Sequence, residues 1–192
     1  MFSRNTLLRN TGMALGFVTV LFAGATALAG PASAATVNAQ VDGTRILVNG
    51  SAVADGIDVS SLGGFITVGN TLGSVAAGPG CQQLGAGVRC PASGITRVDV
   101  FAGAGNDAIR NNTTLPSTLS GDNGADTVNG GSKADLLAGG FGDDVINGGA
   151  GDDQIRGLAG NDRLSGGAGI DRIDGGGDTD SCNGESEINC EL

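Results

Sequence analysis

One large aliphatic residue recurs every nine positions in the second half of the chain, at a fixed place among glycines and aspartates. Four central units read GGFGDDVIN, GGAGDDQIR, GLAGNDRLS and GGAGIDRID, a pattern of G-G-x-G-x-D-x-U-x in which U is aliphatic. Glycines allow the positive φ values and close backbone approach of a tight turn. Each unit therefore predicts a six-residue turn and a short strand centred on U. The U residues are Val128, Leu137, Ile146, Ile155, Leu164 and Ile173.

Seven such units follow one another from Gly121 to Asn183, and some depart from the pattern. Lys133 replaces the fourth glycine in the turn that carries Asp135, so this turn departs from the pattern. Asp178 replaces it in the last turn, where it either distorts the turn or adds a ligand. An earlier copy, AGAGNDAIR, ends ten residues before the array, and VADGIDV at 53–59 is a worn copy of the same pattern.

Two turns in each coil of a solenoid place units 18 residues apart on the same side. The U residues then stack inside, and their neighbours point outward because side chains alternate along a strand. The residues expected outside are Gln154, Arg156, Arg163, Arg172 and Asp174. The sixth-position aspartates form two columns, one of Asp126, Asp144, Asp162 and Asp180 and the other of Asp135, Asp153 and Asp171.

The segment of residues 35–101 has a different pattern. VNAQVDG and RILVNGS, around Asp42-Gly43, predict two strands joined by a turn, and GGFITVGN and GITRVDVF predict further strands. No helical period occurs after residue 34. This segment is expected to be β-structure that caps or continues the solenoid.

Composition and charge limit the partners. The 192 residues include 37 glycines, 6 Phe and no Trp or Tyr, and the net charge is −10 with no basic patch. Nucleic acid and anionic membrane surfaces are therefore poor partners, and a cation is the natural one.

The amino-terminal residues 1–34 have the pattern of a secretory signal peptide: Arg4 and Arg9, an apolar stretch, and two A-x-A sites. The apolar run is too short and too interrupted by glycine for a membrane anchor. Cleavage after Ala34 removes two arginines and no acid, which leaves eight basic and twenty acidic residues, a net charge of −12. The protein is thus expected to be secreted.

Four cysteines in an extracellular chain indicate disulfides, with three ways to pair them. Cys81–Cys90 and Cys182–Cys190 are favoured because each pair closes a short loop. Cys182 occupies a U position, so its bridge to Cys190 would cap the last coil.

Carboxylates and inward glycine carbonyls make an all-oxygen site, which suits Ca²⁺ best. Mg²⁺ demands a tighter octahedron, and zinc prefers His or Cys, whereas the chain has no His. One buried aliphatic residue per nine contributes less free energy than ordering nine residues costs. The repeat is thus expected to need a bound cation in order to fold.

GGFGDDVIN, GGAGDDQIR and GGAGIDRID resemble the RTX, or haemolysin-type, calcium-binding repeat. The resemblance covers Gly121–Asn183 and implies an all-β fold, a parallel β-roll (right-handed β-solenoid) with a β-rich amino-terminal cap. It also implies calcium between turns on the same side, bound by sixth-position aspartates and backbone carbonyls. The metal ligands implied are Asp126, Asp135, Asp144, Asp153, Asp162, Asp171 and Asp180, with the carbonyls of Gly140, Gly142, Gly149, Gly151, Gly167 and Gly169.

The predicted organisation is a signal peptide (1–34), a β-rich segment (35–101), a calcium-binding β-roll (102–183) and a carboxyl-terminal cap (184–192). The predicted function is secreted, non-enzymatic calcium binding with folding coupled to the ion. A surface-adhesion or carbohydrate-binding scaffold, with a cell-surface or matrix glycan as partner, is the alternative. A glycan-active enzyme is a weaker one: without His there is no Ser-His-Asp triad, although two carboxylates suffice for glycoside hydrolysis.

Overall fold

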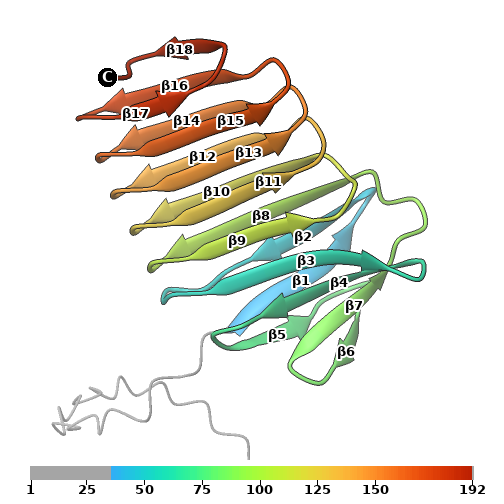
Figure 1. Ribbon diagram of the computed structural model, residues 1–192. Coiled ribbons are helices and arrows are strands. Elements are labelled where there is room, and N and C mark those ends of the chain that lie inside the picture. The colour runs from blue at the N-terminus through green and yellow to red at the C-terminus, as the bar shows by residue number, and fades with distance from the viewer. Residues whose placement is uncertain (1–35, 192) are drawn as a thin grey trace, which may run out of the picture. The chain divides into compact units, whose positions relative to one another are not determined.

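The computed structural model describes residues 36–191, which form two nine-stranded sheets and no helix (Figure 1). This confirms the all-β solenoid expected from the nine-residue repeat. Residues 1–34, the predicted signal peptide, lie outside the described residues. In the part of the chain that is described, no helix is long and apolar enough to cross a membrane.

From β8 onward the strands of each sheet are not consecutive in sequence, because successive strands alternate between the two sheets. The first sheet has the order β18 (Ser186–Ile188), β16 (Arg172–Gly177), β14 (Gln154–Ala159), β12 (Leu136–Phe141), β10 (Ser117–Asn123), β8 (Arg97–Ala104), β2 (Arg45–Asn49), β1 (Thr36–Asp42) and β5 (Ser74–Ala77). The second has the order β17 (Ser181–Asn183), β15 (Arg163–Ala168), β13 (Val145–Ala150), β11 (Thr127–Gly131), β9 (Ala108–Asn112), β3 (Gly56–Leu62), β4 (Phe65–Asn70), β7 (Gly87–Pro91) and β6 (Gln82–Leu84).

Each coil of the repeat region contributes one strand to each sheet, and neighbouring coils pair in parallel. Val128 pairs with Ile146 in the second sheet, and Leu137 pairs with Ile155 in the first. Both steps are 18 residues, as two nonapeptides per coil require. The coils of β8/β9 through β16/β17 are stacked in this way (Figure 1).

The core consists of the aliphatic residues of these strands. All six predicted U residues are at most 3 % exposed. The predicted outward residues face the surface, with Asp174 half-buried and the other four exposed. The interior is thus a stack of aliphatic side chains, contributed by the two sheets in turn.

The amino-terminal segment both continues and caps this stack. β2 and β3 pair in parallel with β8 and β9, so they form one more coil. β1 pairs with β2, and β4 with β3, in antiparallel fashion. The strands expected around Asp42-Gly43 and in GGFITVGN and GITRVDVF are therefore present. The boundaries at 101/102 and 183/184 remain predictions; β8 spans the first of them.

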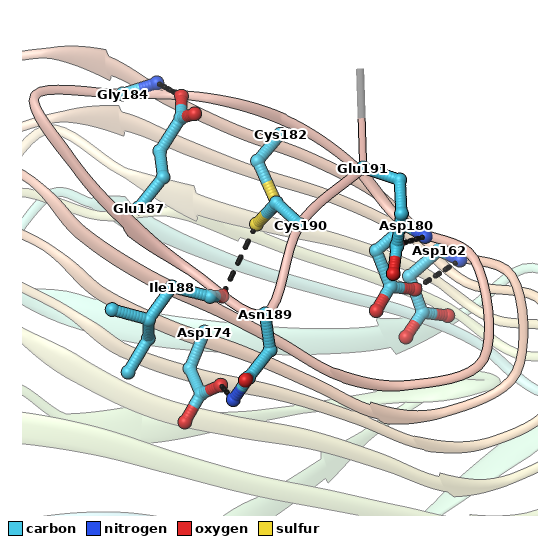
Figure 2. The surroundings of a disulfide bond; sticks show 10 residues. All are labelled: Asp162, Asp174, Asp180, Cys182, Gly184, Glu187, Ile188, Asn189, Cys190 and Glu191. Carbon is cyan, nitrogen blue, oxygen red and sulfur yellow. Dashed lines mark hydrogen bonds between the residues drawn. A yellow bond between two sulfur atoms is a disulfide. The ribbon is translucent and has the colours of Figure 1, made fainter.

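Both favoured disulfides are formed. Cys81 is bonded to Cys90 beside β7, and Cys182 of β17 is bonded to Cys190. The second bridge lies at the end of the described coils, beside the loop that closes the stack (Figure 2).

Candidate metal centre

The turns have the backbone conformation that the glycine pattern requires. In the turn at 139–144, Gly140 and Gly142 have φ values of 135° and 119°. A Cβ at either residue would overlap a carbonyl oxygen of the preceding coil, that of Asp122 or Gly124. The carbonyls of the second and fourth turn residues thus point at the equivalent residues of the next coil. Gly149, Gly151, Gly167 and Gly169 also have positive φ.

The sixth-position aspartates form two ladders parallel to the stacking direction. In each, one carboxyl oxygen accepts a hydrogen bond from the backbone N–H of the aspartate 18 residues earlier. The first ladder has the pairs Asp126→Asp144, Asp144→Asp162 and Asp162→Asp180 at 2.8–2.9 Å. The second has Asp135→Asp153 and Asp153→Asp171 at 2.8 and 2.9 Å. The two predicted columns therefore exist.

The other carboxyl oxygen of these aspartates has no protein partner. The side chains are at most 4 % exposed, yet Oδ2 accepts no hydrogen bond in any of the seven predicted aspartates or in Asp107. A buried, unpaired carboxylate oxygen is costly. A bound cation or a proton on each oxygen would remove that cost.

Backbone carbonyls of the first turn residues lie beside these oxygens, which the sequence reasoning missed. A Cβ at Gly139 would overlap Asp144 Oδ2 and would lie 2.9 Å from the carbonyl oxygen of Gly157 in the next coil. The same arrangement recurs at Gly148, with Asp153 Oδ2 and Gly166 O. The donors beside the unpaired carboxyl oxygens thus include the first glycine of the next coil. The invariant first glycine of the pattern was the available signal.

Burial raises the pKa of the ladder carboxyls. It raises the pKa of Asp144 to about 7 and the pKa values of Asp107, Asp153 and Asp162 to about 6, against the partial opposing effect of the backbone N–H donors. The cause is loss of hydration of the charged form. Neighbouring carboxylates along the ladder raise these pKa values further.

The first ladder extends beyond the predicted aspartates into the amino-terminal coil. Asp107 N–H donates to Asp126 Oδ1 at 2.7 Å, and Asp55 N–H donates to Asp107 Oδ1 at 2.6 Å. Asp55 itself is saturated, since its carboxylate accepts from Asn70 Nδ2 and Ser51 N at 2.8 and 2.7 Å. The first ladder therefore ends at Asp55, where protein groups donate to both carboxyl oxygens and neither is left unpaired. The worn copies at 53–59 and 102–110 carried the signal for both aspartates.

The second ladder begins at Asp135, where two departures meet. Ser117 takes the place of an aspartate, and its N–H and Oγ–H both donate to Asp135 Oδ1, at 2.6 and 2.8 Å. Lys133 is exposed and lacks the positive φ of the fourth turn glycines. Asp135 keeps its place in the ladder, but its turn differs in backbone conformation. On its other side Ser117, unlike an aspartate, offers no second carboxylate.

Asp178 keeps a positive φ at the position of the fourth turn glycine, although its value lies below the 119–142° of Gly142, Gly151, Gly160 and Gly169. Its φ is 74°, a left-handed value that Asp tolerates better than most residues. Asp180, two residues later, still accepts the N–H of Asp162 at 2.9 Å. The substitution therefore leaves the ladder intact.

A separate, exposed set of acceptors runs along the fifth turn position. Asp143 Oδ1 accepts the N–H of Asn161 at 2.8 Å, and Asp152 Oδ1 accepts that of Ile170 at 3.0 Å. Hydrogen bonds from Asn161 lower the pKa of Asp143. These carboxylates are hydrated and satisfied, unlike those of the sixth position.

The donors fit a hard cation. Among residues 36–191, no three carboxylate or thiol side chains converge on one point. A cation bound at the ladders would therefore take backbone carbonyls as well as the unpaired Oδ2 atoms. Such an all-oxygen set suits calcium.

Fold and site together define a parallel β-roll, built of coils of two nonapeptides whose turns carry columns of buried carboxylates. The family model described as the RTX calcium-binding nonapeptide repeat (four copies) matches residues 120–155 and 156–189. Those residues are RTX calcium-binding repeats, which confirms the resemblance. No curated protein and no solved structure matches the chain.

Proposed function

We propose that this protein is a secreted, non-enzymatic calcium-binding β-roll whose repeats fold with the ion. The observation that carries the proposal is the row of buried sixth-position aspartates, each with one carboxyl oxygen that has no partner. The ligands would be the seven predicted aspartates together with turn carbonyls. Bound calcium would neutralise the stacked carboxylates and link adjacent coils.

The coupling to folding follows from the position of the charges. The ladders bring like charges together on buried side chains, and this opposes folding in the absence of a cation. An ion that binds only the folded state shifts the equilibrium toward it. Extracellular calcium modules commonly have dissociation constants of about 10⁻⁴–10⁻³ M, and we expect the same range here.

Secretion and the absence of enzymatic activity rest on separate observations. Both disulfides suit an oxidising compartment, and the 1–34 segment has the pattern of a signal peptide. The chain has no His or Tyr, which excludes the nucleophile–histidine arrangements. The sixth-position aspartates are already engaged in the ladders.

Circular dichroism of the purified, disulfide-bonded protein tests the proposal. Calcium would be titrated into calcium-depleted protein, with magnesium at equal concentrations as the control. A calcium-specific rise in β signal is expected. A full β spectrum without calcium, together with no heat of calcium binding by isothermal titration, would refute the proposal.

A further inference from the structure

The closing loop, residues 184–191, reproduces the contacts of a further turn at the end of the first ladder. Glu191 Oε2 accepts the backbone N–H of Asp180 at 2.7 Å, just as Asp180 Oδ1 accepts that of Asp162 at 2.9 Å (Figure 2). Glu191 N–H donates to the Asp180 carbonyl at 2.8 Å, as Ser181 N–H donates to the Asp162 carbonyl at 2.9 Å. Glu191 therefore continues the ladder although it belongs to no repeat.

The loop also supplies the carbonyl that a further coil would supply. A Cβ at Gly157 would overlap the carbonyl oxygen of Gly175 in the next coil. At Gly175 the equivalent overlap is with the carbonyl oxygen of Asn189. Asn189 thus takes the place of the first glycine of a coil.

A buried, unpaired oxygen lies beside the Asn189 carbonyl. Asp180 is 1 % exposed, its Oδ2 has no hydrogen-bond partner, and this oxygen lies 2.5 Å from where a Cβ of Gly175 would stand. A surface hollow of about 240 Å³ is lined in part by Thr179, Asp180 and Glu191. Solvent therefore reaches Asp180 and Glu191 from this side, although Asp180 Oδ2 itself is buried.

The other column ends differ from this one. At the amino-terminal end, both Asp55 oxygens are satisfied by protein donors. At the end of the second ladder, Glu185 Oε2 accepts Asp171 N–H at 3.0 Å, and the three atoms nearest to a Cβ at Gly166 all belong to Asp171, so no loop carbonyl is identified beside Asp171 Oδ2. Of these three ends, the Asp180 end is the one where a second carboxylate and a loop carbonyl are both identified beside an unpaired oxygen.

We infer that the Asp180 and Glu191 carboxylates and the Asn189 carbonyl form a separate calcium site, made by the closing loop. Two carboxylates balance the charge of a divalent cation, and three oxygen donors leave room for water ligands. The Cys182–Cys190 bridge fixes the residue that precedes Glu191 to β17. The site rests on the proposed function, since it uses the last repeat aspartate as one ligand.

Isothermal titration with calcium would test this site in wild type and Glu191→Gln. The amide oxygen of Gln still accepts the Asp180 N–H, so the loop contact survives while the charge is lost. We expect the variant to bind one calcium equivalent fewer than wild type. Glu187→Gln is the matched control: its carboxylate lies in the same loop and accepts only the Gly184 N–H, so its stoichiometry should equal that of wild type.

The outcomes separate the two proposals. If wild type binds calcium and Glu191→Gln binds the same number with the same affinity, the loop site is refuted and the repeat sites stand. If wild type binds no calcium, both proposals are refuted. A measurement on wild type guards against misfolding of the variant: the carboxyl ¹³C resonance of Glu191 should shift on calcium addition. No shift at saturation would overturn the loop site.

Discussion

The backbone N–H of Asp144 donates to Asp162 Oδ1 at 2.8 Å, while the second oxygen of the same Asp162 carboxylate is buried without a partner. One oxygen thus holds adjacent coils in register, and the other is left for a ligand. The two oxygens therefore have separable roles, because an amide can replace the first but not the charge of the second.

Replacing Asp144 by Asn should weaken calcium binding without breaking the ladder. The Asn oxygen can still accept the Asp126 N–H, but one negative ligand is lost. We expect the calcium concentration at half-saturation to rise about tenfold or more, equivalent to about 1.4 kcal/mol. Circular dichroism during a calcium titration would measure it.

Asp143→Asn is the matched control for that variant. Asp143 is adjacent and makes the same kind of 18-residue contact, but it is exposed and satisfied. The calcium concentration at half-saturation of Asp143→Asn should change less than about threefold, since exposed charges interact weakly. Equal effects of the two variants would show that overall charge, and not the buried oxygen, governs binding.

The nine-residue period predicted the register, the aliphatic column and both aspartate columns, because a strict repeat leaves only one way to stack. It did not assign Asp55 and Asp107 to the ladder. Asp107 precedes Asp126 by 19 residues, and Asp55 precedes Asp107 by 52, so neither interval matches the 18-residue coil that the repeat defines. Glu191 was missed for a similar reason, since it lies only 11 residues after Asp180.

Acid should stabilise the calcium-free fold. The folded pKa values of Asp107, Asp153 and Asp162 are about 6 and that of Asp144 about 7, against 3.8 for a fully exposed aspartate, as in the unfolded chain. A raised folded pKa means that the folded state binds protons more tightly, so its stability is full below about pH 4 and falls as pH rises through 6 to 7. In calcium-depleted buffer, the β signal and melting temperature should therefore rise from pH 8 to pH 5.

With calcium present, acid should instead weaken the fold, because protons compete with the ion for the same oxygens. The calcium midpoint should increase between pH 7.5 and pH 5.5. Repeating both series in 0.5 M NaCl controls for the general net charge, since salt screens exposed charges more than buried ones. If the melting temperature without calcium stayed constant or fell on acidification, the raised pKa values of the buried aspartates would be contradicted.

Gly149→Ala should destabilise the roll severely. Its φ is 103°, and a Cβ there would overlap the carbonyl oxygen of Gly131 in the preceding coil. Strained backbone and a clash with backbone together should cost at least about 2 kcal/mol. Urea unfolding in saturating calcium would measure the change.

Gly63→Ala separates the two causes. Gly63 also has a positive φ, 58°, but a Cβ there would have nothing within 4 Å. Gly63→Ala should therefore lower the free energy of unfolding by only about 1 kcal/mol, the cost of a left-handed backbone at alanine. If the two variants unfolded at the same urea concentration, close stacking of the turns would not be the reason for glycine at position 149.

Removing the Cys182–Cys190 bridge should loosen the last coil and leave the others folded. The bridge closes a loop with a sequence separation of 8 residues, and its loss should cost about 2–3 kcal/mol by the chain-entropy estimate. Because a solenoid coil contacts only its neighbours, the effect should stay local. Hydrogen exchange of the Cys182→Ser/Cys190→Ser variant in calcium should therefore speed up in β17 and β18 and stay unchanged in β10 and β11. Uniformly faster exchange along all coils would mean that the roll unfolds as a single cooperative unit, and that the bridge stabilises the whole of it.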